Sequence, residues 1–186
     1  MTDQEYGNIN FRETPLVHGE YENCDFINCD FSEADLRGFI FIECRFSKCN
    51  LTNAKLSGIS FREVRFRDCK MVGLRFEECL PFLVPPEFQN CTLKLSSFVE
   101  MKLPKIRFLN CDLQEVDFSG ADLTGAGFIH SDLNGAVFDN TILEKSDLSS
   151  AFHYTIDPGK NRIRKAVFSI DGLPGLLEKY GIVIKA

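Results

Sequence analysis

Eight cysteines are the residues best suited to chemistry in this chain, and four of them form two pairs, Cys24 with Cys29 and Cys44 with Cys49. Thiolates bind metal ions and attack electrophiles, so such pairs are the first candidates for a site. Zinc sites generally use closer pairs, for example two cysteines separated by two residues. The spacing therefore does not indicate a metal centre, and we expect no cofactor.

Histidine offers no better basis for catalysis. His18, His130 and His153 lie far apart in the sequence, and no serine or cysteine accompanies them in a pattern typical of a nucleophilic triad. The glycines at positions 120, 125 and 135 recur at multiples of five and do not form a phosphate-binding loop. We interpret them as turn residues of a repeat, and we expect a protein that is not an enzyme.

Phenylalanine or leucine returns at every fifth residue over most of the chain, and this repeat must position the side chains named above. Between Leu16 and Phe76 and between Phe88 and Leu148 there are 26 positions at this spacing, and 24 of them are Leu or Phe. Only Tyr21 and Met71 differ. Self-similarity at a fixed period indicates a repeat architecture.

A period of five fits neither of the two regular structures. Five residues of α-helix turn through about 500°, so an apolar residue at every fifth position would drift around the helix and form no face. In a flat strand, alternate repeats would point to opposite faces because five is odd. A chain that bends by a fixed angle every five residues keeps each central residue, here termed i, pointed at one axis. The period therefore predicts a solenoid.

The neighbours of each central residue indicate which side chains point inward. In an extended segment, i and i−2 share one face, and i−1 and i+1 share the other. All eight cysteines lie at i−2, whereas i−1 is mostly Asp, Asn, Lys or Arg. We therefore predict that the cysteines are small buried residues. Columns such as Cys29, Cys49 and Cys69 would lie within disulfide reach, but we expect free thiols in a reducing cytosol.

The segments SGADLTGAGF and NCDFSEADLRGF resemble the pentapeptide repeat family, whose repeats read small residue, Asp or Asn, Leu or Phe, polar, Gly or polar. The resemblance implies an all-β fold, a right-handed quadrilateral β-helix with coils about 4.8 Å apart. We expect this β-helix over residues 16–151, after a polar lead-in at residues 1–15.

Two segments depart from the repeat. Phe76 and Phe88 are twelve residues apart rather than ten, which predicts a protruding loop at residues 80–87 with Phe82 at its tip. Residues 152–186 lose the period and are expected to cap the rod and form a dimer. Apolar residues at helical spacing, with Pro174 early and Gly181 just after the end, predict a short helix over about 173–180. A terminal strand is expected at 182–184.

The net charge of −6 is unevenly distributed. The segment from Cys111 to Leu148 contains a single base, Lys145, and eight acids, namely Asp112, Glu115, Asp117, Asp122, Asp132, Asp139, Glu144 and Asp147. These carboxylates are either an ordinary solvated surface or a surface for a protein with a basic groove. An acidic rod repels phosphates, so we expect no direct binding of nucleic acid.

The loop and the C-terminal segment KAVFSIDGLPGLLEKYGIVI resemble the subgroup that includes the Qnr and MfpA quinolone-resistance proteins and the immunity protein McbG. This resemblance implies a homodimer that mimics duplex DNA and protects DNA gyrase or topoisomerase IV from a quinolone or a toxin. The acids above would replace phosphates, and Phe82 would contact the enzyme. The expected dimer interface is Leu173, Leu176, Leu177, Tyr180, Ile182 and Ile184. The alternative is a scaffold for a different protein partner.

The expected location follows from what the sequence lacks. No basic segment leads into an apolar one at the N-terminus, and no apolar run reaches membrane-spanning length. We therefore expect a cytoplasmic protein without membrane contact.

Overall fold

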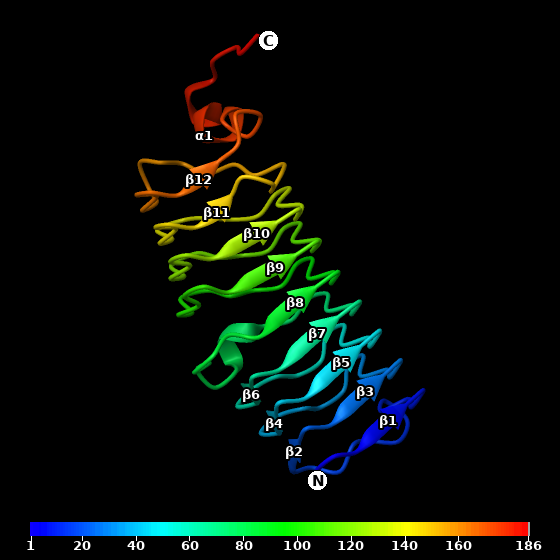
Figure 1. The fold of residues 1–186 in the computed structure, drawn as a ribbon. Coiled ribbons are helices and arrows are strands. Elements are labelled where there is room, and N and C mark those ends of the chain that lie inside the picture. The colour runs from blue at the N-terminus through cyan, green and yellow to red at the C-terminus, as the bar shows by residue number, and fades with distance from the viewer. Residues whose placement is uncertain (186) are drawn as a thin grey trace.

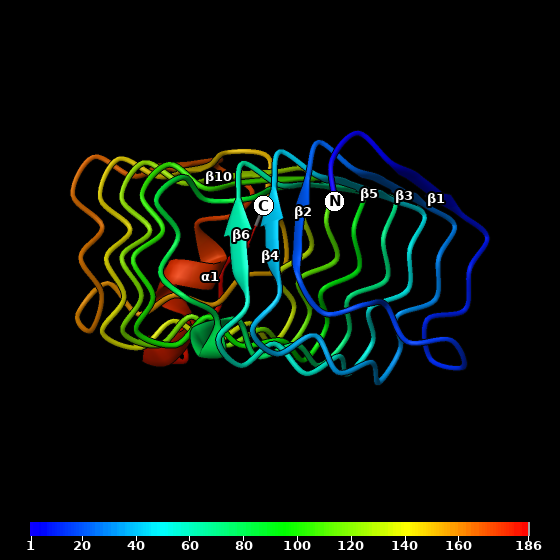
Figure 2. The same ribbon diagram turned by 90° about the horizontal axis from the view of Figure 1, so that it is seen from below.

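Residues 1–185 are described by a computed structural model, and they form a parallel β-solenoid that winds from one end of a rod to the other (Figure 1). Nine strands form one sheet along the rod. They are β1 (Glu5–Gly7), β3 (Asp25–Ile27), β5 (Arg45–Ser47), β7 (Arg65–Arg67), β8 (Glu87–Gln89), β9 (Arg107–Leu109), β10 (Gly127–Ile129), β11 (Asp147–Leu148) and β12 (Val167–Phe168). A second sheet contains β2 (Glu20–Glu22), β4 (Ile40–Ile42) and β6 (Ser60–Arg62), which lie on a different side of the rod (Figure 2).

The strand register confirms the stacking of four repeats per coil. Phe26 in β3 pairs with Phe46 in β5, at a separation of 20 residues, and the same separation joins β9 to β10. The expected lead-in at residues 1–15 also belongs to the solenoid, because β1 pairs with β3. The predicted solenoid is therefore present, and it begins earlier in the chain than expected.

The two extra residues lie in the predicted loop at 80–87. Across it, Phe66 in β7 pairs with Phe88 in β8, at a separation of 22 residues. The short 3₁₀ helix η1 (Phe76–Glu78) leads into the loop, which takes the place of a strand beyond β6 (Figure 1). Phe82 is not at the tip: its side chain is half-buried and packs on the core, whereas Leu83 is 90% exposed. Phe82 points inward because it continues the inward-facing column of the coils on either side.

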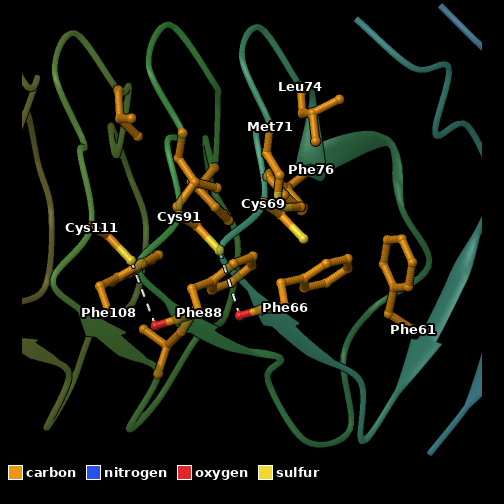
Figure 3. Close-up of a cluster of buried hydrophobic side chains, with 14 of the residues drawn as sticks. Phe61, Phe66, Cys69, Met71, Leu74, Phe76, Phe88, Cys91, Phe108 and Cys111 are labelled. Carbon is orange, nitrogen blue, oxygen red and sulfur yellow. Dashed lines mark hydrogen bonds between the residues drawn. The ribbon is translucent and has the colours of Figure 1, made fainter. Parts of the chain in front are cut away.

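The core consists of the central residues stacked in columns. In the longest aromatic column, the rings of Tyr6, Phe26, Phe46, Phe66, Phe88, Phe108 and Phe128 stack in sequence, with centroids 4.7–5.5 Å apart. Three of these rings are visible in Figure 3. Burial of one such side chain contributes about 1.5–3 kcal/mol, so the column is a major source of stability.

All eight cysteines are buried and free, as the i−2 position predicts. Each of the five that share a column donates a hydrogen bond to a main-chain carbonyl one coil earlier, as from Cys91 to Phe66 over 3.5 Å (Figure 3). The column comprises Cys29, Cys49, Cys69, Cys91 and Cys111. Burial raises the pKa of the Cys44 thiol to about 11 and that of the Cys111 thiol to about 12. These thiols therefore fill space and satisfy inward-facing carbonyls in their neutral form.

The corners between faces require a left-handed backbone at i+2. Gly120, Gly125 and Gly135 have φ values of +69°, +68° and +70°, which confirms their interpretation as turn residues. At other corners the same conformation is adopted by Asn, Glu and Lys residues, and by Leu95 with φ of 59°. Asn tolerates this region better than most residues, which explains its frequency there.

The C-terminal segment packs on the last coil, where the main-chain N–H of Ile156 donates to the carbonyl of Gly175 over 3.0 Å. Helix α1 (Pro174–Leu177) continues into the 3₁₀ helix η2 (Glu178–Tyr180) and ends at Gly181, which confirms the helix expected over 173–180. The strand expected at 182–184 is wrong, since these residues are not in a strand and join neither sheet within residues 1–185. In the described part of the chain, no helix is long and apolar enough to cross a bilayer.

Candidate protein-interaction surfaces

Four faces run along the rod, and each is named here after one of its members. The β1 face carries the nine-stranded sheet, and the β2 face carries β2, β4, β6 and the loop at 80–87. Beyond the loop, the β2 face continues through the bridged positions Lys102, Asp122, Ile142 and Arg162. The Asp112 face contains the bridged positions Lys70, Thr92, Asp112 and Asp132, and the Asp117 face contains Arg75, Ser97, Asp117 and Val137.

The predicted acidic residues do not gather on one face. Asp112 and Asp132 are bridged neighbours on the Asp112 face, whereas Asp117 is bridged to Ser97 and Val137 on the Asp117 face. Asp122 lies on the β2 face and Asp147 on the β1 face, in β11. Successive repeats occupy successive faces, so acids that recur every five residues wind around the rod.

Most of these aspartates have a local structural role. The Asp117 carboxylate accepts a hydrogen bond of 2.8 Å from the main-chain N–H of Ser119, two residues later. The same contact recurs at Asp112, Asp122, Asp132 and Asp147. Hydrogen bonds from Ser149 hold the pKa of the Asp147 carboxyl below its usual value. The repeat thus favours Asp at i−1 because its side chain closes the turn at the corner.

Ion pairs with Lys or Arg neutralise three of the eight acids, and a fourth acid is paired when a histidine is protonated. Lys94 Nζ lies 3.1 Å from Asp112, and Arg162 lies 2.7 Å from Glu144. Asp132 is paired with His153 when that histidine is protonated, and Asp139 is paired with Lys160. Within residues 1–185, no such partner is present for Glu115, Asp117, Asp122 or Asp147. The carboxylates without ion-pair partners are therefore few and are distributed around the whole rod.

The C-terminal end presents the largest group of exposed apolar side chains. Of the predicted interface residues, Leu173, Tyr180, Ile182 and Ile184 are exposed, whereas Leu176 and Leu177 are half-buried. Leu176 packs against the core. Ile170 and Val183, which the sequence interpretation missed, are 85% and 84% exposed. Exposed apolar groups that lie together are typical of an interaction site.

The loop is a second apolar surface. Leu80, Leu83 and Val84 are 48%, 90% and 51% exposed. From the sequence, Phe82 is expected at the tip of this loop. The spacing could have corrected this choice, since Phe82 falls close to a central position of the coil.

The family model described as pentapeptide repeats matches in eight copies over residues 8–43, 44–80, 91–128 and 125–152. The chain belongs to the pentapeptide repeat family. The residues 81–90 that this match omits include most of the loop, so the family pattern and the register both locate the interruption. Pentapeptide repeat solenoids are generally scaffolds rather than enzymes, and the described residues contain no cluster of His, Cys, Asp and Glu suited to a metal ion.

Solved pentapeptide repeat proteins share this fold. HetL from the cyanobacterium Nostoc sp. strain PCC 7120, described as involved in regulation of heterocyst differentiation, is 18% identical with a TM-score of 0.63, over 91% of this chain and 85% of HetL. A trypsin-treated form of QnrB1, a plasmid-mediated fluoroquinolone resistance protein, is 18% identical with a TM-score of 0.54. A second such form is 24% identical with a TM-score of 0.51, and 99% of each chain is covered in both comparisons. A search of the curated proteins gave no match.

Proposed function

We propose that this pentapeptide repeat protein binds a bacterial type II topoisomerase, DNA gyrase or topoisomerase IV, and protects it from a quinolone or a gyrase-targeting toxin. The observation that carries the proposal is the exposed apolar surface at the C-terminal end of a regular rod, where Tyr180, Ile182 and Ile184 are 63%, 55% and 51% exposed. Two copies joined there would form one rod of twice the length. The fold shared with QnrB1 supports this proposal.

The charge of the rod suits an enzyme that binds DNA. Duplex DNA carries about one negative charge per 1.7 Å, and its partners present basic grooves. The net charge of −6 and the carboxylates distributed over all four faces give the rod a negative potential from several directions. Such a potential increases the rate of encounter with a basic groove. The apolar loop around Leu83 and Phe82 would then contact the enzyme beside the groove. The proposal requires a cytoplasmic location.

Supercoiling and decatenation assays test this function directly. The protein should inhibit gyrase or topoisomerase IV, or restore its activity in the presence of a quinolone, at micromolar concentration. The variant with Ile182→Asp and Ile184→Asp should lose most of the effect, because it would remain a single short rod. Val17→Asp, at an exposed position near the opposite end, is the matched control. If neither enzyme responds with or without the drug, the topoisomerase proposal fails.

A scaffold for a different protein partner is the second candidate. It is favoured by the local role of the aspartates, since residues such as Asp132 and Asp147 form hydrogen bonds that close turns whatever the rod binds. The shared fold with HetL, which is described as involved in regulation, fits this candidate. Its test is binding without enzyme inhibition. A purified partner should be retained by the protein and lost with Leu83→Ser, while both topoisomerase assays remain unchanged.

A further inference from the structure

The β2 face differs from the other three in how its charges are paired. Elsewhere, charges on adjacent coils form ion pairs, such as Arg45 with Asp25 at 3.2 Å on the β1 face and Lys94 with Asp112 at 3.1 Å on the Asp112 face. On the β2 face, the only pair within residues 1–185 is Arg162 with Glu144. Most charges of this face are therefore available to a partner.

These free charges are separated by sign along the rod. Before the loop, the β2 face exposes five acids and one basic side chain, Arg62; the acids are Asp3, Glu20, Glu22, Glu43 and Glu63. After the loop, it carries two acids, Asp122 and Glu144, and six exposed bases, namely Lys102, Lys105, Lys145, Arg162, Arg164 and Lys165. The face has a negative half and a positive half, with the loop between them.

We propose that a second copy of the chain packs antiparallel against the β2 face. A two-fold axis that crosses the face at the loop places the acidic half of each copy opposite the basic half of the other. Rotation about this axis reverses the direction along the rod but not the direction across the face. Each long edge of the face therefore meets the same edge of the partner. Glu43 and Glu63 lie at i+2 corners, as do Lys105, Lys145 and Lys165, and all five have the same left-handed backbone. These two groups of corner residues therefore meet across the axis.

The loop provides an apolar centre for this contact. The exposed side chains of Leu80, Leu83 and Val84 lie at the middle of the face and would meet their equivalents at the axis. An apolar centre within a charged rim is the usual anatomy of a protein interface. A parallel arrangement would place like charges opposite each other, which is unfavourable. The charge pattern thus selects the antiparallel arrangement.

The size of the face determines the strength of the contact. A strip of about eight coils at about 4.8 Å spacing, and about 12 Å wide, buries about 450 Å² per copy, at the low end for specific interfaces. We therefore expect a weak dimer that dissociates as salt screens the charges. This contact uses a different surface from the proposed C-terminal interface. It covers the loop that would contact the topoisomerase, so a copy of the chain and the enzyme would compete for that loop.

Sedimentation velocity measures this association. The full-length chain carrying Ile182→Asp and Ile184→Asp is the parent for all variants, so that the C-terminal contact does not contribute. At about 100 µM protein, the parent should dimerise in about 20 mM salt and dissociate in about 500 mM salt. Two variants reverse the charge of two corner residues in one half of the face, namely Glu43→Lys with Glu63→Lys and Lys105→Glu with Lys145→Glu. Each should weaken association by at least about tenfold. Glu and Lys both occur at these corners, so the variants should fold.

Exchange of the corner charges between the two halves tests the charge pattern of the face. In a variant with all four substitutions, the corner charges are exchanged between the two halves, so each acidic corner again faces a basic corner, and the variant should dimerise again to within about threefold of the parent. The control is Lys48→Glu with Lys70→Glu, exposed residues of other faces, which gives the same charge change as the lysine reversal and should leave association unaffected. A monomeric parent at low salt, reversals without effect, or a folded exchange variant that stays monomeric would each overturn the proposal.

Cross-linking tests the orientation. A zero-length carbodiimide should join Glu22 to Lys145 or Lys165. Within one chain these residues are about six coils apart, or about 30 Å, so such a product must join two copies. Cross-links between the two acidic halves through an added diamine, without the acid-to-lysine product, would contradict the antiparallel arrangement. A parent that remains monomeric but binds an acidic peptide or an oligonucleotide through Lys145 would assign the basic half to a polyanion instead.

Discussion

The Cys111 thiol donates a hydrogen bond to the main-chain carbonyl oxygen of Phe88, 3.6 Å away in the preceding coil. One coil later, the Ser131 hydroxyl makes the equivalent bond to the carbonyl of Phe108 over 3.3 Å. The position thus requires a small hydrogen-bond donor rather than sulfur chemistry. Asn161 and Thr141 donate in the same way to Phe138 and Phe118, which shows that the requirement extends to another column.

We therefore expect Cys111→Ser to change the free energy of unfolding by less than about 1 kcal/mol. Cys111→Ala should cost about 1–3 kcal/mol, because it leaves the buried Phe88 carbonyl without a donor. Urea unfolding of the two variants measures the difference. Equal stability of the serine and alanine variants would show that the hydrogen bond contributes nothing.

The buried thiols should make stability depend on alkaline pH. Burial raises the pKa of the Cys44 thiol to about 11 and that of Cys111 to about 12, whereas an unfolded cysteine titrates near pH 8.5. The native state therefore binds more protons than the unfolded state above about pH 8.5. The stabilisation is fully present below that pH and is lost as pH rises towards 12.

A thiol reagent at pH 8 provides an independent measurement of the same burial. All eight cysteines should react slowly in the native protein and rapidly in denaturant. Rapid reaction of several thiols without unfolding would show that the cysteine column opens to solvent.

Leu95 is the least suitable residue at a left-handed corner, with φ of 59° and a side chain that is 59% exposed. Leu95→Gly should stabilise the protein by about 0.5–1 kcal/mol, because it removes backbone strain without loss of core packing. Gly125→Ala, at φ of +68°, should destabilise it by about 1 kcal/mol. Thermal unfolding measures both variants. A lower melting temperature for Leu95→Gly would mean that the leucine packs in solution.

The proposed C-terminal contact predicts a change in mass in solution. The wild-type protein should scatter light as a dimer, and Ile182→Asp with Ile184→Asp should be monomeric in physiological salt, because two charges would be buried in an apolar interface. Val17→Asp should remain dimeric. Leu176→Asp is unsuitable for this test, since Leu176 packs on the core and its substitution would also destabilise the fold. A monomeric wild type would exclude the doubled rod.

The five-residue spacing was sufficient to predict the solenoid, the burial of the cysteines and the two-residue interruption. Each of these depends on which side of the chain a residue faces, and the period determines that. The expected strand at 182–184 failed because a strand needs a neighbour, and no local pattern shows whether one is present. Phe82 is expected at the tip of the loop, but it packs on the core because it falls close to a central, inward-facing position of the coil.

The five-residue period identifies the acidic residues, but only the longer coil period shows which of them share a face. At five residues, Asp112, Asp117 and Asp122 form one series, but they lie on three different faces. Only at the coil repeat of 20 residues do residues of one face fall together, as Glu43 and Glu63 do, and the loop changes that count to 22. The sequence therefore determines the charge separation on the β2 face, but the separation can be recognised only when the coil length and the position of the interruption are known.

The two-residue interruption affects only one of the four faces. The nine-stranded sheet passes it without a break, and β7 pairs with β8 in full register. Insertions or deletions in the loop can therefore be absorbed where they occur, and every later coil keeps its neighbours. A lineage could vary the length and chemistry of this loop freely, or an engineer could replace it with a binding peptide, while the rod that carries it remained unchanged.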